Sequence, residues 1–137
     1  MKKHFQVILI MVVSLTTIVC CTKENTDVRD SFDATYLVSE TWQENSVTRN
    51  KPAFTMSVLK SAQSPDKIIL SNFANYGSGI LAEAVVSGTI ITIPQQTIAN
   101  SKSISGSGRL ENSSLIMTYT ETSGGNSFVV TVNAKKL

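Results

Sequence analysis

Residues 114–134 read SLIMTYTETSGGNSFVVTVNA, and this stretch decides the fold that we expect. Apolar and polar side chains alternate over residues 114–122 and again over residues 127–134. A period of two is the pattern of a β-strand with one buried face. The intervening Ser123-Gly124-Gly125-Asn126 supplies the glycines that a tight turn with positive φ angles requires. The stretch therefore predicts a β-hairpin.

Alternation with a period of two continues along the chain from about residue 34, and helical periodicity is absent there. Short separators such as Ser64-Pro65-Asp66 force neighbouring strands to run antiparallel, because a parallel return needs a crossover of about a dozen residues. The sequence therefore predicts an all-β domain of about eight strands. We expect an antiparallel meander that forms an up-and-down barrel or a strongly curled sheet. The predicted strands cover residues 34–42, 53–60, 67–73, 80–86, 89–94, 102–110, 114–122 and 127–134.

Some of these segments carry more specific information. Residues 80–86 and 89–94 are apolar on both faces, which favours central strands. Gly106 and Gly108 share one face of a predicted strand, and they indicate either a bend or close backbone approach, or a frayed and irregular strand. A barrel of eight strands is either filled by side chains or holds one small ligand, and the sequence leaves both alternatives open.

The N-terminal region has the make-up of a secretory signal. Lys2 and Lys3 precede an apolar run over residues 5–19, which ends at Cys20-Cys21. A helix of this length is about 22 Å long, shorter than the ~30 Å hydrocarbon core of a bilayer. The run is therefore a poor permanent membrane span and a good signal-peptide core.

Ile18-Val19-Cys20-Cys21 resembles a bacterial lipobox, which has an aliphatic residue three places before the acylated cysteine and a small residue directly before it. This resemblance implies lipidation of Cys21, with Cys20 as the alternative, and attachment to the membrane through covalent lipid. Several acyl chains together anchor a protein durably. Cys21-Thr22-Lys23-Glu24 also resembles the surface-export tag of Bacteroidetes lipoproteins. The implied location is the cell outer membrane, facing either the periplasm or the cell surface.

Such processing divides the chain into three parts. We expect a signal peptide over residues 1–20, a lipid-anchored flexible tether over residues 21–31 and a β-barrel domain over residues 32–137. Residues 27–32 could form one helical turn before the first strand, with Phe32 as a plug.

Charge and reactive residues argue against several classes of function. Without the two lysines of the signal, ten basic residues balance ten acidic ones, and a neutral domain argues against nucleic acid as a partner. The only histidine and both cysteines lie at or before position 21, so the domain lacks the residues of a thiol or zinc site. Glu40, Glu83 and Glu121 lie on predicted strands, but nothing pairs them for catalysis. We expect no catalytic residue, no metal and no cofactor.

Aromatic residues are the candidates for a ligand site. Tyr36 and Trp42 share one face of the first predicted strand, where they line either a ligand mouth or the core. The connection over residues 72–79 is long enough to form a lip over a barrel opening. Tyr76 in this connection is either an exposed ring that stacks on a sugar or hydrophobic ligand, or part of a plain surface loop. Glu83 is either a buried polar anchor or, as we favour, a solvent-facing carboxylate.

The layout of residues 28–137, a helical turn followed by an eight-strand meander, resembles the lipocalin-like (calycin) domains of Bacteroidetes lipoproteins. This resemblance implies a non-enzymatic, lipid-anchored envelope protein whose barrel binds a small apolar ligand or a glycan. The alternative is a filled barrel that acts as an accessory or protein-interaction module in an envelope complex.

Overall fold

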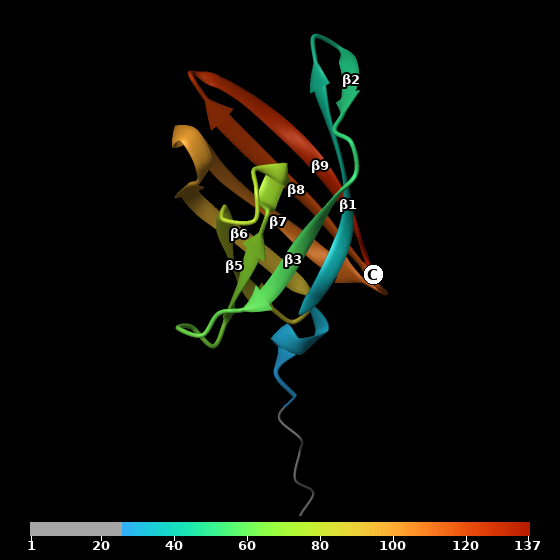
Figure 1. The fold of residues 1–137 in the computed structure, drawn as a ribbon, viewed down its shortest axis with the longest axis vertical. Coiled ribbons are helices and arrows are strands. Elements are labelled where there is room, and N and C mark those ends of the chain that lie inside the picture. Colours follow the sequence, from blue (N-terminus) through green and yellow to red (C-terminus); the bar gives the residue numbers. More distant parts are fainter. Residues whose placement is uncertain (1–25) are drawn as a thin grey trace, which may run out of the picture.

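The protein is a closed antiparallel β-barrel with a short 3-10 helix, η1 (Val28–Ser31), at its N-terminal end (Figure 1). The computed structural model describes residues 26–137, so the expected signal peptide and both cysteines lie outside the described residues. Neighbouring strands along the chain pair with one another, and β1 also pairs with β9. The strands are β1 (Ala34–Glu44), β2 (Val47–Asn50), β3 (Phe54–Lys60), β4 (Lys67–Ser71), β5 (Leu81–Ser87), β6 (Ile90–Thr97), β7 (Ser103–Glu111), β8 (Ser114–Ser123) and β9 (Asn126–Lys136).

Strand β1 closes the barrel because it has partners on both sides. Its first residues pair with β3, and seven residues from Tyr36 to Trp42 pair with β9. Its last residues pair with β2, an additional short strand beside the eight that form the barrel. The predicted meander of about eight strands in an up-and-down barrel is thus confirmed. Strand β2 was not predicted from the sequence, although Asn45 and Ser46 form the turn before it at φ angles of 51° and 65°.

Side chains fill the barrel interior. Every second residue points inward, and the largest of these side chains come from different strands, so that they meet across the barrel. The interior is therefore a packed core. The largest fully buried side chains are Tyr36, Tyr119, Phe32, Phe73, Met56, Ile68, Leu70, Ile91, Ile93, Ile104, Leu115 and Met117.

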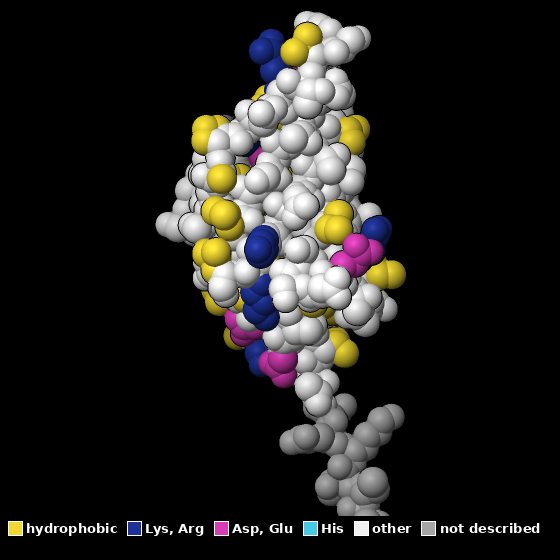
Figure 2. Space-filling model, turned by 90° about the vertical axis from the view of Figure 1, so that its right-hand side faces the viewer, with side chains coloured by type: hydrophobic (Ala, Val, Ile, Leu, Met, Phe, Trp, Pro, Cys, Tyr) yellow, Lys and Arg dark blue, Asp and Glu magenta, His cyan; other side chains and the backbone are white. Residues whose placement is uncertain are grey.

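Closure of the barrel contradicts the prediction of central strands at residues 80–86 and 89–94. Residues 80–86 and 89–94 are not central strands covered on both faces, because each strand of a closed single-layer barrel has one face outside. Leu81 on β5 and Ile90 on β6 are both 54% exposed. Figure 2 shows apolar side chains in small separate groups on one side of the molecule, among charged and polar groups.

Gly106 and Gly108 allow β7 and β8 to approach closely. Gly106 pairs with Tyr119 and Gly108 pairs with Met117, two of the largest side chains of the core. A Cβ atom on Gly106 would lie 2.4 Å from the carbonyl oxygen of Thr118 and 2.7 Å from the Cα atom of Tyr119. The two glycines therefore mark a close backbone approach inside a continuous strand, as one of the two alternatives predicted.

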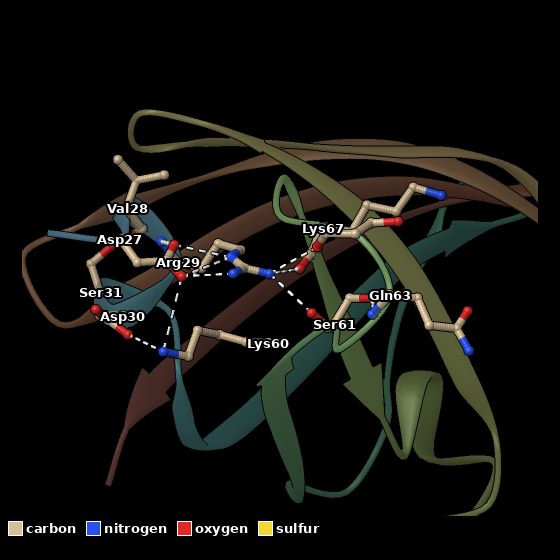
Figure 3. A network of polar contacts seen from close by, with 10 residues as sticks. Asp27, Val28, Arg29, Asp30, Ser31, Lys60, Ser61, Gln63 and Lys67 are labelled. Atoms are coloured by element: carbon tan, nitrogen blue, oxygen red, sulfur yellow. Dashed lines mark hydrogen bonds and ion pairs between the residues drawn. The ribbon is translucent and has the colours of Figure 1, made fainter. Parts of the chain in front are cut away.

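The N-terminal end of the barrel is closed by η1 and by Phe32, which is fully buried. Asp27 caps η1 by accepting a hydrogen bond from the backbone N–H of Arg29, and the Arg29 guanidinium holds the pKa of Asp27 at about 2. The Nη1 atom of Arg29 donates to the carbonyl oxygens of Ser61 and Ser64 in the β3–β4 connection and of Lys67 at the start of β4 (Figure 3).

The predicted helical turn with Phe32 as a plug is therefore confirmed. Residues 27–31, which we expected at the end of a flexible tether, belong to the folded part, because η1 and the Arg29 contacts join them to the barrel.

We expect Gly106→Ala to lower the free energy of unfolding by about 2 kcal/mol, because the new methyl group collides with the backbone of β8. Urea denaturation followed by circular dichroism measures this change. Gly79→Ala is the matched control, since nothing lies within 4 Å of the added atom, and it should change stability by less than about 0.5 kcal/mol. Equal stability of the two variants would contradict the close approach.

Candidate functional site

Figure 1 shows η1 at one end of the barrel. The other end carries a cluster of charged and aromatic side chains from five parts of the chain. Strands β1 and β8 supply inward-facing residues near this end. The segments after β2, after η2 (Phe73–Asn75) and after η3 (Ala99–Ser101) supply one residue each. We name this group the mouth cluster. It consists of Glu40, Lys51, Tyr76, Lys102, Tyr119 and Glu121.

The turn η2 lies across this end of the barrel and inserts Phe73 into it. Phe73 is 1% exposed, and its ring centroid lies 4.8 Å from that of Tyr119. The chain leaves β4 at Ser71 because Asn72 adopts a left-handed φ of 61°, which ends the strand two residues earlier than we expected. Ala74 also has a positive φ, 55°, and its carbonyl oxygen accepts a hydrogen bond of 3.0 Å from Lys51 Nζ. The connection 72–79 thus does form a lip.

Glu40 is buried in the mouth cluster, with only 2% of its surface exposed. Its Oε2 atom lies 2.9 Å from Lys51 Nζ, and its Oε1 atom accepts a hydrogen bond of 3.2 Å from the Tyr119 hydroxyl. Burial, and next the negative charge of Glu40, raise the pKa of Tyr119, so this hydroxyl stays protonated and donates. The buried carboxylate therefore has both a counterion and a hydrogen-bond donor.

Glu121 has a similar pair of partners. Its Oε1 atom lies 2.6 Å from Lys102 Nζ, and its Oε2 atom accepts a hydrogen bond of 2.7 Å from the Tyr76 hydroxyl. Lys102 also donates to that hydroxyl at 2.9 Å. The pKa of Lys102 is raised, mainly by its hydrogen bond to Glu121, and burial raises the pKa of Tyr76. At neutral pH Lys102 is thus charged, and the hydroxyl groups of Tyr76 and Tyr119 are neutral.

The ammonium groups of Lys51 and Lys102 both lie over the ring of Tyr76. Lys102 Nζ lies 4.7 Å and Lys51 Nζ lies 5.1 Å from the ring centroid, which are cation–π distances. The ring is half-buried, not exposed as we expected. It joins the Glu40 pair to the Glu121 pair.

A cavity of about 240 Å³ opens beside the mouth cluster. It includes two of the three residues that we proposed from the sequence, Trp42 and Tyr76. Tyr36 is not among them, because it is fully buried in the core and its hydroxyl donates to the Phe32 carbonyl at 3.0 Å. The lining residues are Trp42, Glu44, Lys51, Tyr76, Glu121, Phe128 and Val130.

The glutamates on the predicted strands separate into two groups. Glu40 and Glu121 reach the mouth, whereas Glu83 is exposed on the outside of β5 and forms an ion pair with Lys67, as we favoured. The alternation in the sequence contained a signal for Glu40 and Glu121, because each lies on the inward-facing side of its strand. Glu40, for example, continues the inward-facing series of Tyr36 and Val38. Lys51 lies between two predicted strands and Lys102 is the first residue of another, so the alternation did not mark either of them as inward-facing.

Within residues 26–137, no group of three or more His, Cys, Asp or Glu residues is placed to hold a metal ion. None of the helices in this described part is long and apolar enough to cross a membrane.

Comparisons with known proteins support the fold. No family model and no curated protein matches this chain. A crystal structure of a "putative outer membrane protein" from Bacteroides fragilis is similar, with a TM-score of 0.54 and 19% sequence identity. The match covers 80% of this chain and 53% of that chain, so this chain spans about half the length of its neighbour. At this identity the likeness shows a shared fold.

We expect Lys51→Met to destabilise the protein by about 2–3 kcal/mol, because Glu40 then keeps a buried charge without a counterion. Chemical denaturation measures the loss. The double variant Glu40→Leu/Lys51→Met should recover part of it, since an apolar pair replaces the ion pair. Lys67→Met, which breaks the exposed pair with Glu83, is the control and should have little effect. A Lys51 variant as stable as this control would contradict the argument.

Proposed function

We propose that this protein is a non-enzymatic, lipid-anchored protein of the bacterial outer membrane that binds a small ligand at the mouth of its barrel. The observation that carries the proposal is the contrast between the two parts of the barrel. Large side chains fill the interior, whereas the mouth combines a cavity, the aromatic rings of Trp42 and Phe128 and several charged groups. Convergent polar groups beside apolar side chains are typical of ligand sites.

The location rests on two supports. One is the resemblance of Ile18-Val19-Cys20-Cys21 to a lipobox. The other is the fold shared with the "putative outer membrane protein" of Bacteroides fragilis. An acyl anchor at Cys21 attaches the chain to the membrane without a spanning helix.

An anchor at Cys21 also orients the barrel. Asp27 lies six positions after Cys21, and a fully extended chain spans this separation in about 20 Å at most. Asp27 caps η1, which lies at the plugged end of the barrel (Figure 1). The mouth cluster lies at the other end, beneath η2. In this arrangement the plugged end stays near the membrane and the mouth points away from it, towards soluble ligands.

We expect Cys21→Ala to abolish labelling by a palmitate analogue and to release the protein from the membrane fraction. Metabolic labelling followed by cell fractionation measures both effects. Cys20→Ala is the matched control and should leave labelling unchanged. Labelling that survives in Cys21→Ala and disappears in Cys20→Ala would move the anchor to Cys20. Labelling of both variants would contradict Cys21 as the required site, and an unaltered protein without label would contradict lipidation.

A second candidate function is that of an accessory module that binds another envelope protein. The filled barrel and its outward apolar side chains favour it, since five large apolar residues on the eight barrel strands are between 43% and 59% exposed. These residues are Leu37, Leu59, Leu81, Ile90 and Val129. Against it, the side of the molecule in Figure 2 shows apolar side chains in small groups, whereas protein interfaces usually present a contiguous patch.

Native mass spectrometry separates the two functions. The full-length protein, purified from its host in detergent, should carry a non-covalent small molecule that is lost from the Phe128→Ala variant, because Phe128 lines the cavity. Ile90→Ala, on the outside of β6, should retain it. A protein partner bound in a fixed ratio, without a small molecule, would favour the accessory function instead.

A further inference from the structure

We infer that the mouth cavity takes a neutral, hydroxylated ring, that is, one sugar unit of an uncharged glycan. This inference rests on the proposed binding function and narrows it to one ligand class. Four properties of the mouth lead to it: its charge balance, its free hydrogen-bonding groups, its aromatic surface and its size.

The charges at the mouth cancel in pairs. Glu40 pairs with Lys51 at 2.9 Å, Glu121 with Lys102 at 2.6 Å and Glu44 with Arg49 at 3.0 Å. A charged ligand would bring an extra charge into a partly buried site in which every carboxylate already has its cation. Desolvating an ion without a partner is costly. The charge balance therefore favours a ligand without net charge.

Hydrogen-bonding groups of both kinds remain free in the cavity. Lys51 has three N–H donors, and one of them is taken by the Ala74 carbonyl. Glu40 Oε2 lies 2.9 Å from Nζ as an ion-pair partner but accepts no hydrogen bond from it, so the ammonium group keeps donors for a ligand. Glu44 accepts from Arg49 with Oε2, which leaves Oε1 as an acceptor. A ligand that both accepts from an ammonium and donates to a carboxylate satisfies the two. Hydroxyl groups do both.

The stacking surface comes from Trp42 and Phe128. Tyr76 is unsuited to this role, because both lysines already lie over its ring and its hydroxyl is bound to Glu121. Trp42 on β1 pairs with Val130 on β9, two residues along from Phe128, so the two rings line the same cavity from adjacent strands. An apolar wall beside charged donors and acceptors suits a sugar ring, whose C–H groups and hydroxyls face different directions.

The size of the cavity argues against a lipid. Its volume is about 240 Å³, below the ~300 Å³ at which pockets for drug-sized ligands begin. A long acyl chain would have to continue into the barrel, where Phe73 and Tyr119 are each 1% exposed and fill the space. One ring fits the cavity, and the remainder of a longer glycan extends into solvent.

The test uses the single tryptophan of the chain as its reporter, since Trp42 lines the cavity. The full-length protein is held in a polyoxyethylene detergent, which has no sugar headgroup, and titrated while its emission is recorded. The neutral arm contains hexoses, pentoses, N-acetylhexosamines and their short oligomers. A charged arm contains glucosamine and glucuronate, and an apolar arm contains palmitate.

We expect a saturable change in emission with at least one neutral sugar and none with the charged or apolar compounds. Phe128→Ala and Glu44→Gln should each weaken binding at least tenfold, whereas Ile90→Ala should leave it unchanged. Circular dichroism checks that the variants are folded, and Glu44→Gln, at the exposed rim, keeps the shape of the replaced side chain.

The other outcomes separate the inference from the proposed function. Saturable binding of palmitate or of a charged sugar, weakened by Phe128→Ala, overturns the neutral-glycan inference and leaves the binding function standing. Binding of a neutral sugar that Phe128→Ala and Glu44→Gln do not weaken also overturns the inference. No response in any arm at millimolar concentrations overturns both.

Discussion

The pairing of β1 with β9 is the constraint on which the rest of the structure depends. It joins seven residues of the first barrel strand to the last strand and leaves the eight barrel strands without an open edge between them. Because the sheet closes on itself, one face of each strand points into a space only wide enough for side chains. Closure thus makes the interior a core and confines polar chemistry to the ends of the barrel.

The two ends of the barrel are closed in different ways. The N-terminal end is sealed by Phe32 and fastened by Arg29, whose guanidinium joins η1 to the β3–β4 connection. The opposite end is covered by η2, which inserts Phe73 but brings no charge of its own. There the inward series of β1 and β8 continue into Glu40 and Glu121, and each carboxylate needs a counterion because it is shielded from water.

The lysines that provide these counterions also determine which groups of the mouth remain available to a ligand. Lys51 and Lys102 neutralise the two buried carboxylates and also lie over the ring of Tyr76, so the polar network is largely satisfied from within. What remains for a ligand is the rim of this network and the rings of Trp42 and Phe128. A filled barrel can therefore still carry a binding site, at its end and not in its interior. This arrangement differs from a hollow barrel, in which a ligand occupies the central space.

The sequence by itself determined the all-β class, the antiparallel order of the strands, the Gly124–Gly125 turn and the plug at Phe32, because these depend on local alternation and on turn residues. It also placed Trp42 and Tyr76 among the candidates, but as aromatic residues and not as neighbours. Only the tertiary structure decided that Tyr36 belongs to the core, that Tyr76 holds two lysines and that Phe128 lines the cavity. The physical reason is that the mouth is assembled from segments up to 81 positions apart, such as Glu40 and Glu121, which are brought together by strand closure. No period along the chain encodes that closure.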